Sequence, residues 1–256
     1  MVSTDARSSL DRPGFLAHRR GVDRKASCRC GSGRQYRNCC YSQDRAGEEA
    51  RRAARSGLEQ IESVVRVLLP LVESRGEHKV ACKAGCNACC AQFVRASLPE
   101  ALLIADWLRL PENAAVRARF EEKLPAWREA AQPETGELTQ LMAAEAGGPQ
   151  EGPAWERFRE LEARYVRKRN FCPFNHQGNC EIYPIRPGIC RAYNVIDTAE
   201  YCVPDAGGSP AVLSHPRLDE ALRQAAALGA EGARRLGKEE HPLPLPEAVA
   251  WAVQAR

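Results

Sequence analysis

Helical periodicity dominates this chain of 256 residues. Across 44–75 an apolar stripe lies opposite an Arg/Glu face, which predicts one amphipathic helix that kinks or ends near Pro70. Further along, Ser97 and Glu100 have the spacing of a capping box, with a proline early in the first turn. A second helix is therefore predicted from there to residue 110.

The rest of the pattern predicts a mainly helical protein with one small irregular β-hairpin. Short β-type segments flank an Asn-His-Gln-Gly-Asn turn within 171–183. The Pro- and Gly-rich stretch 132–153 predicts a surface connection, and residues 1–27, which lack periodicity, predict a flexible arm. The remaining helices are predicted at 113–131 with a break or kink at Pro125, at 155–168, at 217–236 and after Pro246.

The twelve cysteines fall into three tight sets. The sets are Cys28, Cys30, Cys39 and Cys40; Cys82, Cys86, Cys89 and Cys90; and Cys172, Cys180, Cys190 and Cys202. Close spacing and two adjacent Cys-Cys pairs favour thiolates that converge on metal ions over disulfides between distant loops. A chain of this length can also bury a core without disulfides. We therefore predict that these cysteines are metal ligands.

The composition also indicates in which cellular compartment, and with which partners, such a protein would work. The first twenty residues carry arginines and no apolar run, so no secretory signal is predicted and a cytosolic protein is expected. The apolar run at 64–72 is short and interrupted, so no membrane span is expected. A reducing cytosol favours metal binding over disulfides. Twelve thiolates around three divalent ions would change the formal net charge from +4 to about −2, so basicity gives no reason to expect nucleic acid beyond weak RNA contact.

The first cysteine set occupies one short segment, residues 28–40. Gly31 and Gly33 allow tight backbone turns, so that four sulfurs can surround one ion. A segment this small cannot fold by burial alone, and metal binding would supply the missing free energy. The run Cys-Arg-Cys-Gly-Ser-Gly-Arg-Gln-Tyr-Arg-Asn-Cys-Cys resembles the SEC-C motif, found at the C-terminal tail of the SecA translocation ATPase and in other bacterial proteins.

That resemblance implies a zinc knuckle with the four cysteines of this set as ligands and a contact with a protein or ribosomal partner. The alternative is a knuckle that only caps the helix after it. Arg29, Arg34 and Arg37 could touch RNA phosphates or an acidic partner, but we expect them to be solvated.

The second and third sets are too spread to form one finger each. Successive gaps in the third set are seven, nine and eleven residues. We therefore expect the two sets to combine in one composite site of eight sulfurs. Four thiolates around a divalent ion leave a formal charge of about −2, so nearby cations are expected. Lys83, Arg186 and Arg191 could supply them, or could be ordinary surface residues.

Spaced signatures in this region resemble the YkgJ family, described as zinc- or iron-chelating cysteine-cluster domains. They are Cys-x3-Cys-x2-Cys-Cys, then Phe-Cys-Pro-Phe, then Gly-Asn-Cys-x-Ile-Tyr, then Arg-Pro-x2-Cys-Arg. The resemblance implies the ligands Cys82, Cys86, Cys89, Cys90, Cys172, Cys180 and Cys190, with Cys202 as an eighth candidate. The family also includes flagellin lysine methylases, but this chain lacks a glycine-rich nucleotide loop, so methylase activity is not carried over.

Sulfur ligands alone do not separate zinc from iron at the composite site. The spacing differs from the ferredoxin run Cys-x2-Cys-x2-Cys, which favours zinc slightly. The leading hypothesis is a metal-binding protein that holds zinc or iron, with the knuckle as a partner-contact module. The rival is an iron-sulfur or non-haem iron enzyme of redox or methyl-transfer type, and a metal store is a third candidate.

Other residues have ordinary explanations beside functional ones. His78 and His176 could be labile ligands or water-facing side chains, and Asp197 and Glu181 could act as a base near iron or face solvent. Surface positions are expected for His18, His215 and His241, and core packing for Tyr183, Phe171, Phe174 and Trp107.

These features divide the chain into four predicted parts. They are an arm at 1–27, the knuckle at 28–42, a connecting helix at 43–75 and a cysteine-cluster domain at 76–256. The sequence indicates no catalytic residue, and it leaves the oligomeric state open.

Overall fold

Helices make up most of the protein, as the sequence predicts. The computed structural model describes residues 23–76, 78–82, 85–132, 134–144, 151–203, 207–238 and 243–254. The α-helices in these ranges are α1 (Tyr41–Ser74), α2 (Leu98–Leu108), α3 (Ala114–Ala131), α4 (Glu134–Ala144), α5 (Gly152–Arg167), α6 (Gly188–Ala192), α7 (Pro216–Arg235) and α8 (Leu245–Gln254). The strands are β1 (Arg95–Ala96), β2 (Asn175–His176), β3 (Asn179–Cys180) and β4 (Leu243–Pro244). The mainly α class with a small hairpin is confirmed.

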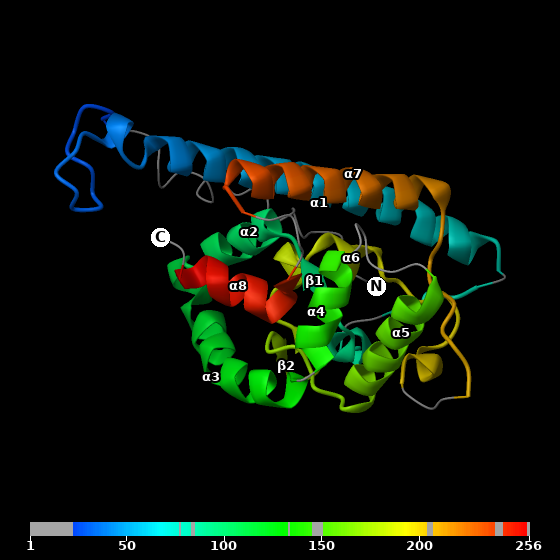
Figure 1. Ribbon diagram of the computed structural model, residues 1–256. Helices are drawn as coiled ribbons and strands as arrows, with labels where there is room; N and C mark the ends of the chain where they lie inside the picture. Colours follow the sequence, from blue (N-terminus) through cyan, green and yellow to red (C-terminus); the bar gives the residue numbers. More distant parts are fainter. Residues whose placement is uncertain are drawn as a thin grey trace.

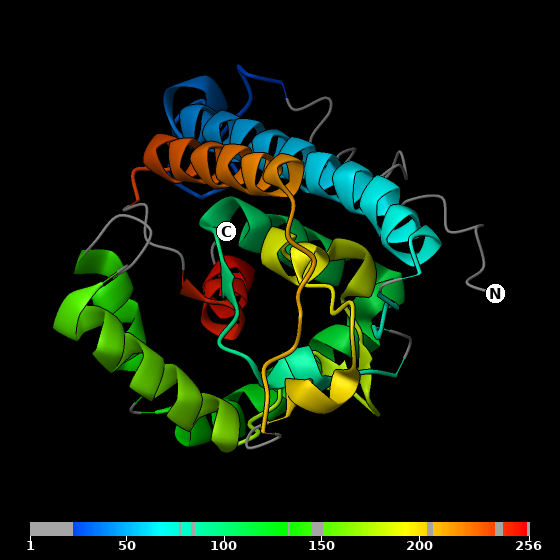
Figure 2. The ribbon, with the colours of Figure 1, turned by 90° about the vertical axis from the view of Figure 1, so that its right-hand side faces the viewer.

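Helices α1 and α7 lie side by side and form one layer of the molecule (Figures 1 and 2). The predicted apolar stripe of α1 is buried, and Leu58 and Ile61 have at most 1% of their surface exposed. The two helices approach closely because small residues meet between them: a Cβ on Gly57 would lie 2.9 Å from the Cβ of Ala225. This layer covers one side of the remaining helices.

The second layer is built around α2, which is buried over most of its length. Its predicted capping box is present: the Ser97 hydroxyl accepts a hydrogen bond from the Glu100 backbone N–H, and the Glu100 carboxylate accepts one from the Ser97 N–H at 2.8 Å. Helix α8 packs on α2, and β4 pairs antiparallel with β1 just before α2. The chain after residue 243 is thereby fixed to the centre of the fold.

Two prolines lie inside helices: α1 ends near Pro70, as the sequence predicts, whereas the break predicted as one possibility at Pro125 is absent. Helix α1 continues one turn beyond Pro70, and α3 continues beyond Pro125. In α3 the buried side chains of Leu124 and Trp127 lie on both sides of the proline, so packing outweighs the lost backbone hydrogen bond.

The predicted surface connection at 132–153 was wrong for its first half, which contains helix α4. Buried Leu138 and Met142 face the core, and the carboxylate of Glu134 pairs with Arg164 at 3.1 Å and with Lys168. These contacts with α5 and the loop after it stabilise a helix that the glycine and proline content disfavours.

The hairpin β2–β3 forms at the predicted turn, with Asn175 opposite Cys180. Gln177 and Gly178 both have positive φ, +51° and +80°. The Phe174 ring stacks on the Phe120 ring of α3 with centroids 4.4 Å apart, which fixes the hairpin to the core. Phe174 therefore has the predicted packing role.

Within the described residues, none of the helices combines the length and the apolar character that a membrane crossing requires. Of the predicted arm, residues 1–22 lie outside the described part of the chain, whereas 23–27 belong to the knuckle segment described below.

Candidate metal centres

The sequence predicts a knuckle at 28–42, whereas in the structure the segment comprises residues 23–40, because α1 begins at Tyr41 and backbone contacts start at Asp23. This segment is called the knuckle below, and its own backbone folds it. Ser27 and Gln35 form an antiparallel bridge, and the Cys28 N–H donates to the Arg34 carbonyl at 2.7 Å. Between them Gly31 and Gly33 have φ of +78° and +71°, which other residues rarely adopt. The 3-10 helix η3 (Tyr36–Asn38) then leads the chain into α1.

This fold brings four sulfurs together. The Sγ atoms of Cys28, Cys30, Cys39 and Cys40 all lie within 4.8 Å of one another. The Cys30 and Cys39 sulfurs are 3.4 Å apart, and those of Cys39 and Cys40 are 3.8 Å apart. Tetrahedral zinc with bonds of roughly 2.3 Å to sulfur requires separations of about 3.8 Å. The group therefore could hold a metal ion, and all twelve cysteines are free thiols rather than disulfides.

The thiols of the knuckle differ in how readily they ionise. The Ser32 hydroxyl and backbone N–H lower the pKa of Cys30 to about 6. Hydrogen bonding to Cys28 and to the other thiols raises the pKa of Cys40 to about 12. Without an ion the set therefore shares protons, and binding a metal to four thiolates would release them.

The knuckle is attached to the start of α1, whose N-cap residue is Cys40. The Tyr36 hydroxyl donates to the Asp44 carboxylate at 2.7 Å, and Arg29 pairs with the same carboxylate at 3.0 Å. The Tyr36 and Tyr41 rings meet edge to face at 5.8 Å. These contacts fix the orientation of the knuckle relative to the first turn of α1.

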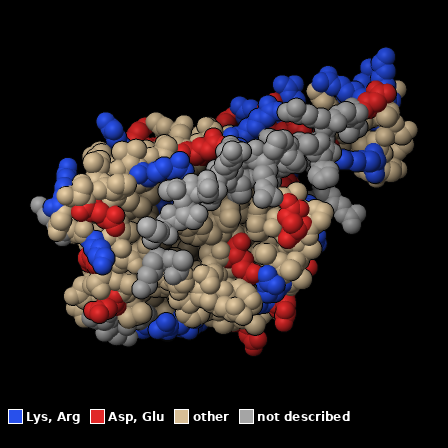
Figure 3. All heavy atoms as spheres, turned by 180° about the vertical axis from the view of Figure 1, so that it is seen from behind, with Lys and Arg blue, Asp and Glu red and all other residues tan. Residues whose placement is uncertain are grey.

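The knuckle projects from one end of the molecule, beyond the α1–α7 layer (Figure 1). Basic side chains gather at this end, as Figure 3 shows from behind. The exposed ones in the knuckle are Arg24, Lys25, Arg29, Arg34 and Arg37. Arg29 is paired with Asp44, and the guanidinium of Arg24 lies over the Tyr41 ring.

We call the other eight cysteines the dispersed cysteine group; they are Cys82, Cys86, Cys89, Cys90, Cys172, Cys180, Cys190 and Cys202. Cys89 and Cys90 lie on the 3-10 helix η4 (Ala88–Ala91), Cys180 on β3, Cys190 on α6 and Cys202 at the end of the 3-10 helix η7 (Ala199–Cys202). Seven of the eight are half-buried, and Cys89 is exposed.

Backbone contacts bring the second and third sets next to each other. The Cys172 N–H donates to the Cys90 carbonyl at 2.8 Å, and the Val195 N–H donates to the Cys82 sulfur at 3.2 Å. Helices η4 and η7 are also in contact. The spatial neighbourhood that the sequence predicts is therefore present.

Electrostatic interactions link the members of this group, and Cys89 interacts with Cys172 and Cys190 as well as with Cys82 and Cys202. Burial raises the pKa of Cys172 and Cys190, and their thiols interact with Cys89 and Cys180. Burial, Cys86 and Cys82 raise the pKa of Cys202 to about 11. Among the described residues, the four knuckle cysteines form the one group whose ligand atoms all lie within 4.8 Å of one another. The dispersed cysteines are neighbours in the fold, but their sulfurs do not meet this spacing. Their role as ligands stays a prediction.

Of the predicted counter-charges, Arg186 faces the dispersed group. Burial raises the pKa of Cys180 and Cys190, and the positive charge of Arg186 opposes this rise. The Arg186 guanidinium stacks 3.7 Å from the centroid of the Tyr183 ring. Arg191 instead pairs with Glu62 at 2.9 Å and donates to two backbone carbonyls. Lys83 lies outside the described residues.

Helix α6, which carries Cys190, is positioned by α1 and α2. The Gly188 N–H donates to the Glu100 carboxylate at 2.8 Å, so the capping residue of α2 also holds the start of α6. A Cβ on Gly188 would lie 2.7 Å from Ile61 on α1. Sequence reasoning missed α6, because five residues are too few to show a helical period.

The remaining candidates mostly have structural roles. Glu181 pairs with Arg119, and an oxygen of Asp197 accepts from the Ala211 N–H at 2.8 Å. His215 is the N-cap of α7, where its Nδ1 accepts from the Arg217 N–H. Tyr183 was wrongly predicted as a core residue, since 59% of its surface is exposed.

His176 lies on β2 and is half-buried, and Phe171 and Trp107 are half-buried as well. His78 is exposed and interacts with Asp197. His18 and His241 lie outside the described residues.

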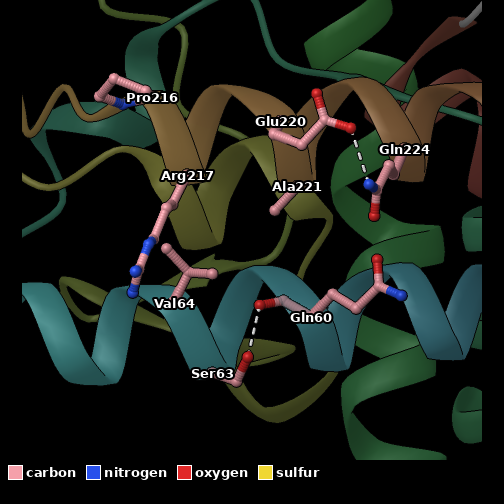
Figure 4. Close-up of a pocket in the computed structure, with 8 residues that line it drawn as sticks. All are labelled: Gln60, Ser63, Val64, Pro216, Arg217, Glu220, Ala221 and Gln224. Atoms are coloured by element: carbon pink, nitrogen blue, oxygen red, sulfur yellow. Dashed lines mark hydrogen bonds between the residues drawn. The ribbon is translucent and has the colours of Figure 1, made fainter.

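Two concave regions lie away from the dispersed group. A shallow pocket of about 420 Å³ lies between α1 and α7, where Gln224 donates to Glu220 on α7 and the Ser63 hydroxyl donates to the Gln60 carbonyl on α1 (Figure 4). A wider groove of about 1610 Å³ runs between the knuckle and the helices α1, α2, α3 and α8, with Cys30 and Cys40 at its rim. The groove places a concave surface beside the knuckle.

Comparison of the chain with family models, with curated proteins and with solved structures gives no match.

Proposed function

We propose that this chain is a metal-binding protein whose knuckle holds zinc and whose dispersed cysteine group holds zinc or iron. The observation that carries the proposal is the set of four knuckle sulfurs within 4.8 Å of one another. Four thiols on a self-folded loop at a helix N-terminus are a donor set that suits zinc. The resemblance of this segment to the SEC-C motif supports the same assignment.

The dispersed cysteine group offers soft thiolate ligands and a nearby cation, which suit a zinc or iron site. The eight thiols come from two remote parts of the chain that are in contact through Cys172 and Cys90 and through η4 and η7, and the guanidinium of Arg186 acts on several of them. A cation beside a thiolate-bound ion offsets its formal negative charge. The resemblance to the YkgJ family supports a zinc or iron site here, which would supply either a closed structural centre or an open one for redox chemistry.

For the knuckle we propose a contact with a protein or ribosomal partner. It projects beyond the helical layer, carries exposed basic side chains and borders the wide groove. The rival role is stability alone, in which the knuckle only fixes the start of α1. We propose a cytoplasmic location, because free thiols persist in a reducing compartment.

The test is metal analysis of protein purified without oxygen or chelator. We expect one zinc ion that is lost in Cys39→Ser, and further zinc or iron that this variant keeps. Because the knuckle makes its own backbone contacts, the variant should change the free energy of unfolding of the helical part by less than about 0.5 kcal/mol. Protein without any bound metal, or a Cys39→Ser variant that retains every ion, contradicts the proposal.

Colour separates the two candidate roles of the dispersed group. Visible absorption bands and oxygen sensitivity would favour an iron enzyme, whereas colourless protein with stoichiometric zinc would favour a structural or binding role.

A further inference from the structure

The four cysteines of the knuckle differ in how far solvent reaches them. Cys30 is exposed, Cys28 is buried, and Cys39 and Cys40 are half-buried. Oxidation of a cysteine depends on its thiolate character and on access, so a dissolved oxidant reaches an exposed thiolate first. Cys30 is therefore the knuckle residue with which such an oxidant would react.

A second sulfur lies close enough to react with an oxidised Cys30. The Cys30 and Cys39 sulfurs are 3.4 Å apart. A disulfide has about 2.05 Å between its sulfurs, so these two atoms need to approach by only about 1.4 Å. The Ser32 hydroxyl lies 3.2 Å from the Cys39 sulfur, which holds that sulfur beside the turn that follows Cys30.

The turn after Cys30 has room for this approach. Gly31 and Gly33 are exposed, and a Cβ on either of them would have no neighbour within 4 Å. The backbone that carries the Cys30 sulfur can therefore shift without displacing a packed side chain.

Cys39 has a less suitable partner on its other side. Cys40 is adjacent to it and is the N-cap residue of α1. Neighbouring Cα atoms are about 3.8 Å apart, which is below the range of about 4.4 to 6.8 Å that disulfides usually span. The geometry therefore favours a disulfide of Cys39 with Cys30 over one with Cys40.

We propose that Cys30 is a site of oxidation by peroxides, that Cys39 converts the oxidised residue into a reversible disulfide, and that this releases the metal ion of the knuckle. The inference rests on the proposed zinc site and adds a form of regulation to it. The exposed position of Cys30 and the 3.4 Å separation of the two sulfurs carry it.

Both chemical steps balance with hydrogen peroxide as the oxidant. The Cys30 thiolate attacks a peroxide oxygen: an S–O bond forms, the O–O bond breaks, and the leaving hydroxide takes a proton from solvent. The Cys39 thiolate then attacks the Cys30 sulfur: an S–S bond forms, the S–O bond breaks, and a second hydroxide takes a proton. The two sulfurs together lose two electrons, and the peroxide becomes two molecules of water.

The disulfide removes two of the four donors, because the thiolate is the form of cysteine that binds a metal. Cys28 and Cys40 remain, fewer than the four ligands of a structural zinc site. The bonds of Tyr36 and Arg29 with Asp44 involve no sulfur, so the knuckle stays attached to α1. A dithiol reductant would restore all four thiolates.

The test uses the full chain with its metal, treated with about one equivalent of hydrogen peroxide and then with an alkylating reagent. Trypsin cuts after Arg29, Arg34 and Arg37, so Cys30 lies on the peptide 30–34, Cys28 on 26–29, and Cys39 with Cys40 on 38–45. We expect the first disulfide to join 30–34 to 38–45, and fragmentation of the linked peptides to assign it to Cys39.

A chromogenic chelator measures the released metal in the same samples. About one zinc ion per chain should be released as the disulfide forms, and dithiothreitol should reverse both changes.

Three variants separate the roles of the cysteines. Cys39→Ser should stop the reaction at a Cys30 sulfenic acid, which dimedone traps at least about tenfold more than in wild type. Cys28→Ser loses a metal ligand but keeps the reacting pair, so it should still form the disulfide. Cys89→Ser is the matched control, since Cys89 is the exposed member of the dispersed group, and disulfide formation and zinc release should stay within about twofold of wild type.

The proposal is overturned if zinc-loaded protein keeps its zinc in peroxide, if the first disulfide does not include the peptide 30–34, or if Cys89→Ser abolishes the reaction. Zinc measured before oxidation keeps the two proposals apart. Zinc-free protein that forms the Cys30–Cys39 disulfide contradicts only the metal assignment, whereas zinc-loaded protein that resists peroxide contradicts only the oxidation site.

Discussion

The knuckle and the dispersed cysteine group bring their cysteines near one another by opposite routes. In the knuckle, turns at Gly31 and Gly33 and a few backbone hydrogen bonds place four sulfurs within one short segment. The dispersed group instead depends on η4, the hairpin, α6 and η7, each fixed by packing elsewhere in the fold. A substitution in the knuckle should therefore abolish metal binding there without destabilising the helical part. A substitution in the dispersed group should reduce both its metal binding and the stability of the fold.

The largest effect is expected from Cys172→Ser. This residue joins the two halves of the dispersed group through its N–H bond to Cys90 and has a thiol that burial keeps protonated without metal. Loss of a bound ion should lower the free energy of unfolding by about 3 kcal/mol, as followed by denaturant unfolding. Metal analysis should show that the knuckle ion is retained; loss of all metal would remove the distinction between the two regions.

A smaller effect is expected from Gly188→Ala, which keeps every cysteine. The new methyl group would meet the Cδ1 of buried Ile61, so either that side chain repacks or α6 shifts away from α1, and we expect a cost of about 2 kcal/mol. Gly136→Ala is the matched control, since a Cβ there has no neighbour within 4 Å and alanine favours the helix. Should both variants be equally stable and bind equal metal, the packing of α6 does not support the dispersed group.

Low pH should lower the free energy of unfolding of the helical part through Glu134. The carboxylate of Glu134 pairs with Arg164 and Lys168 and so holds α4 against the chain leading to Cys172. Burial alone would raise the pKa of Glu134, but the hydrogen bond from Lys168, the Glu134 backbone N–H and the positive charges of Lys168 and Arg164 together outweigh it, and the net pKa is lowered. The stability from this carboxylate is therefore present above the ordinary carboxyl range near about 4.3 and is lost as the pH falls through the lowered value.

We expect Glu134→Gln to cost about 2 kcal/mol at neutral pH, and the difference from wild type to shrink at about pH 3. Thermal unfolding at both pH values measures it, with the exposed Glu160→Gln as control. A difference that stays constant with pH would show that the charge of Glu134 is not what stabilises α4.

The smallest effect is expected from Arg186→Gln, which removes the cation facing the dispersed group. Metal affinity there should fall about tenfold, with no change at the knuckle, as measured by competition with a chelator. Arg169, which lies over the Phe171 ring and is exposed, provides the control Arg169→Gln. Equal losses in both variants would mean that general charge, not the position of Arg186, matters.

The sequence predicted those parts of the fold that depend on neighbours along the chain. The stripe of α1, the capping box of Ser97 and Glu100 and the turn around Gly178 are all local signals, and each is present. The knuckle set also came from local spacing. In each case the physical cause lies within a few residues of its effect.

What the sequence could not predict depends on long-range contacts. Helix α4 is stabilised by the ion pairs of Glu134 with α5 and the loop after it, and β1 and β4 are too short to show alternation. The hydrogen bond from the Cys172 N–H to the Cys90 carbonyl depends on how the chain folds back, and no spacing rule relates residues so far apart.

Helix α1 sets a minimum distance between the two cysteine regions. At about 1.5 Å per residue, its 34 residues span about 51 Å, with Cys40 at its first end and Cys82 only a short segment past the other. Even a fully extended return of that segment would leave Cys40 and Cys82 about 25 Å apart. These two cysteines could therefore never be ligands of one ion, and metals proposed for the two regions would have to be loaded in separate binding events.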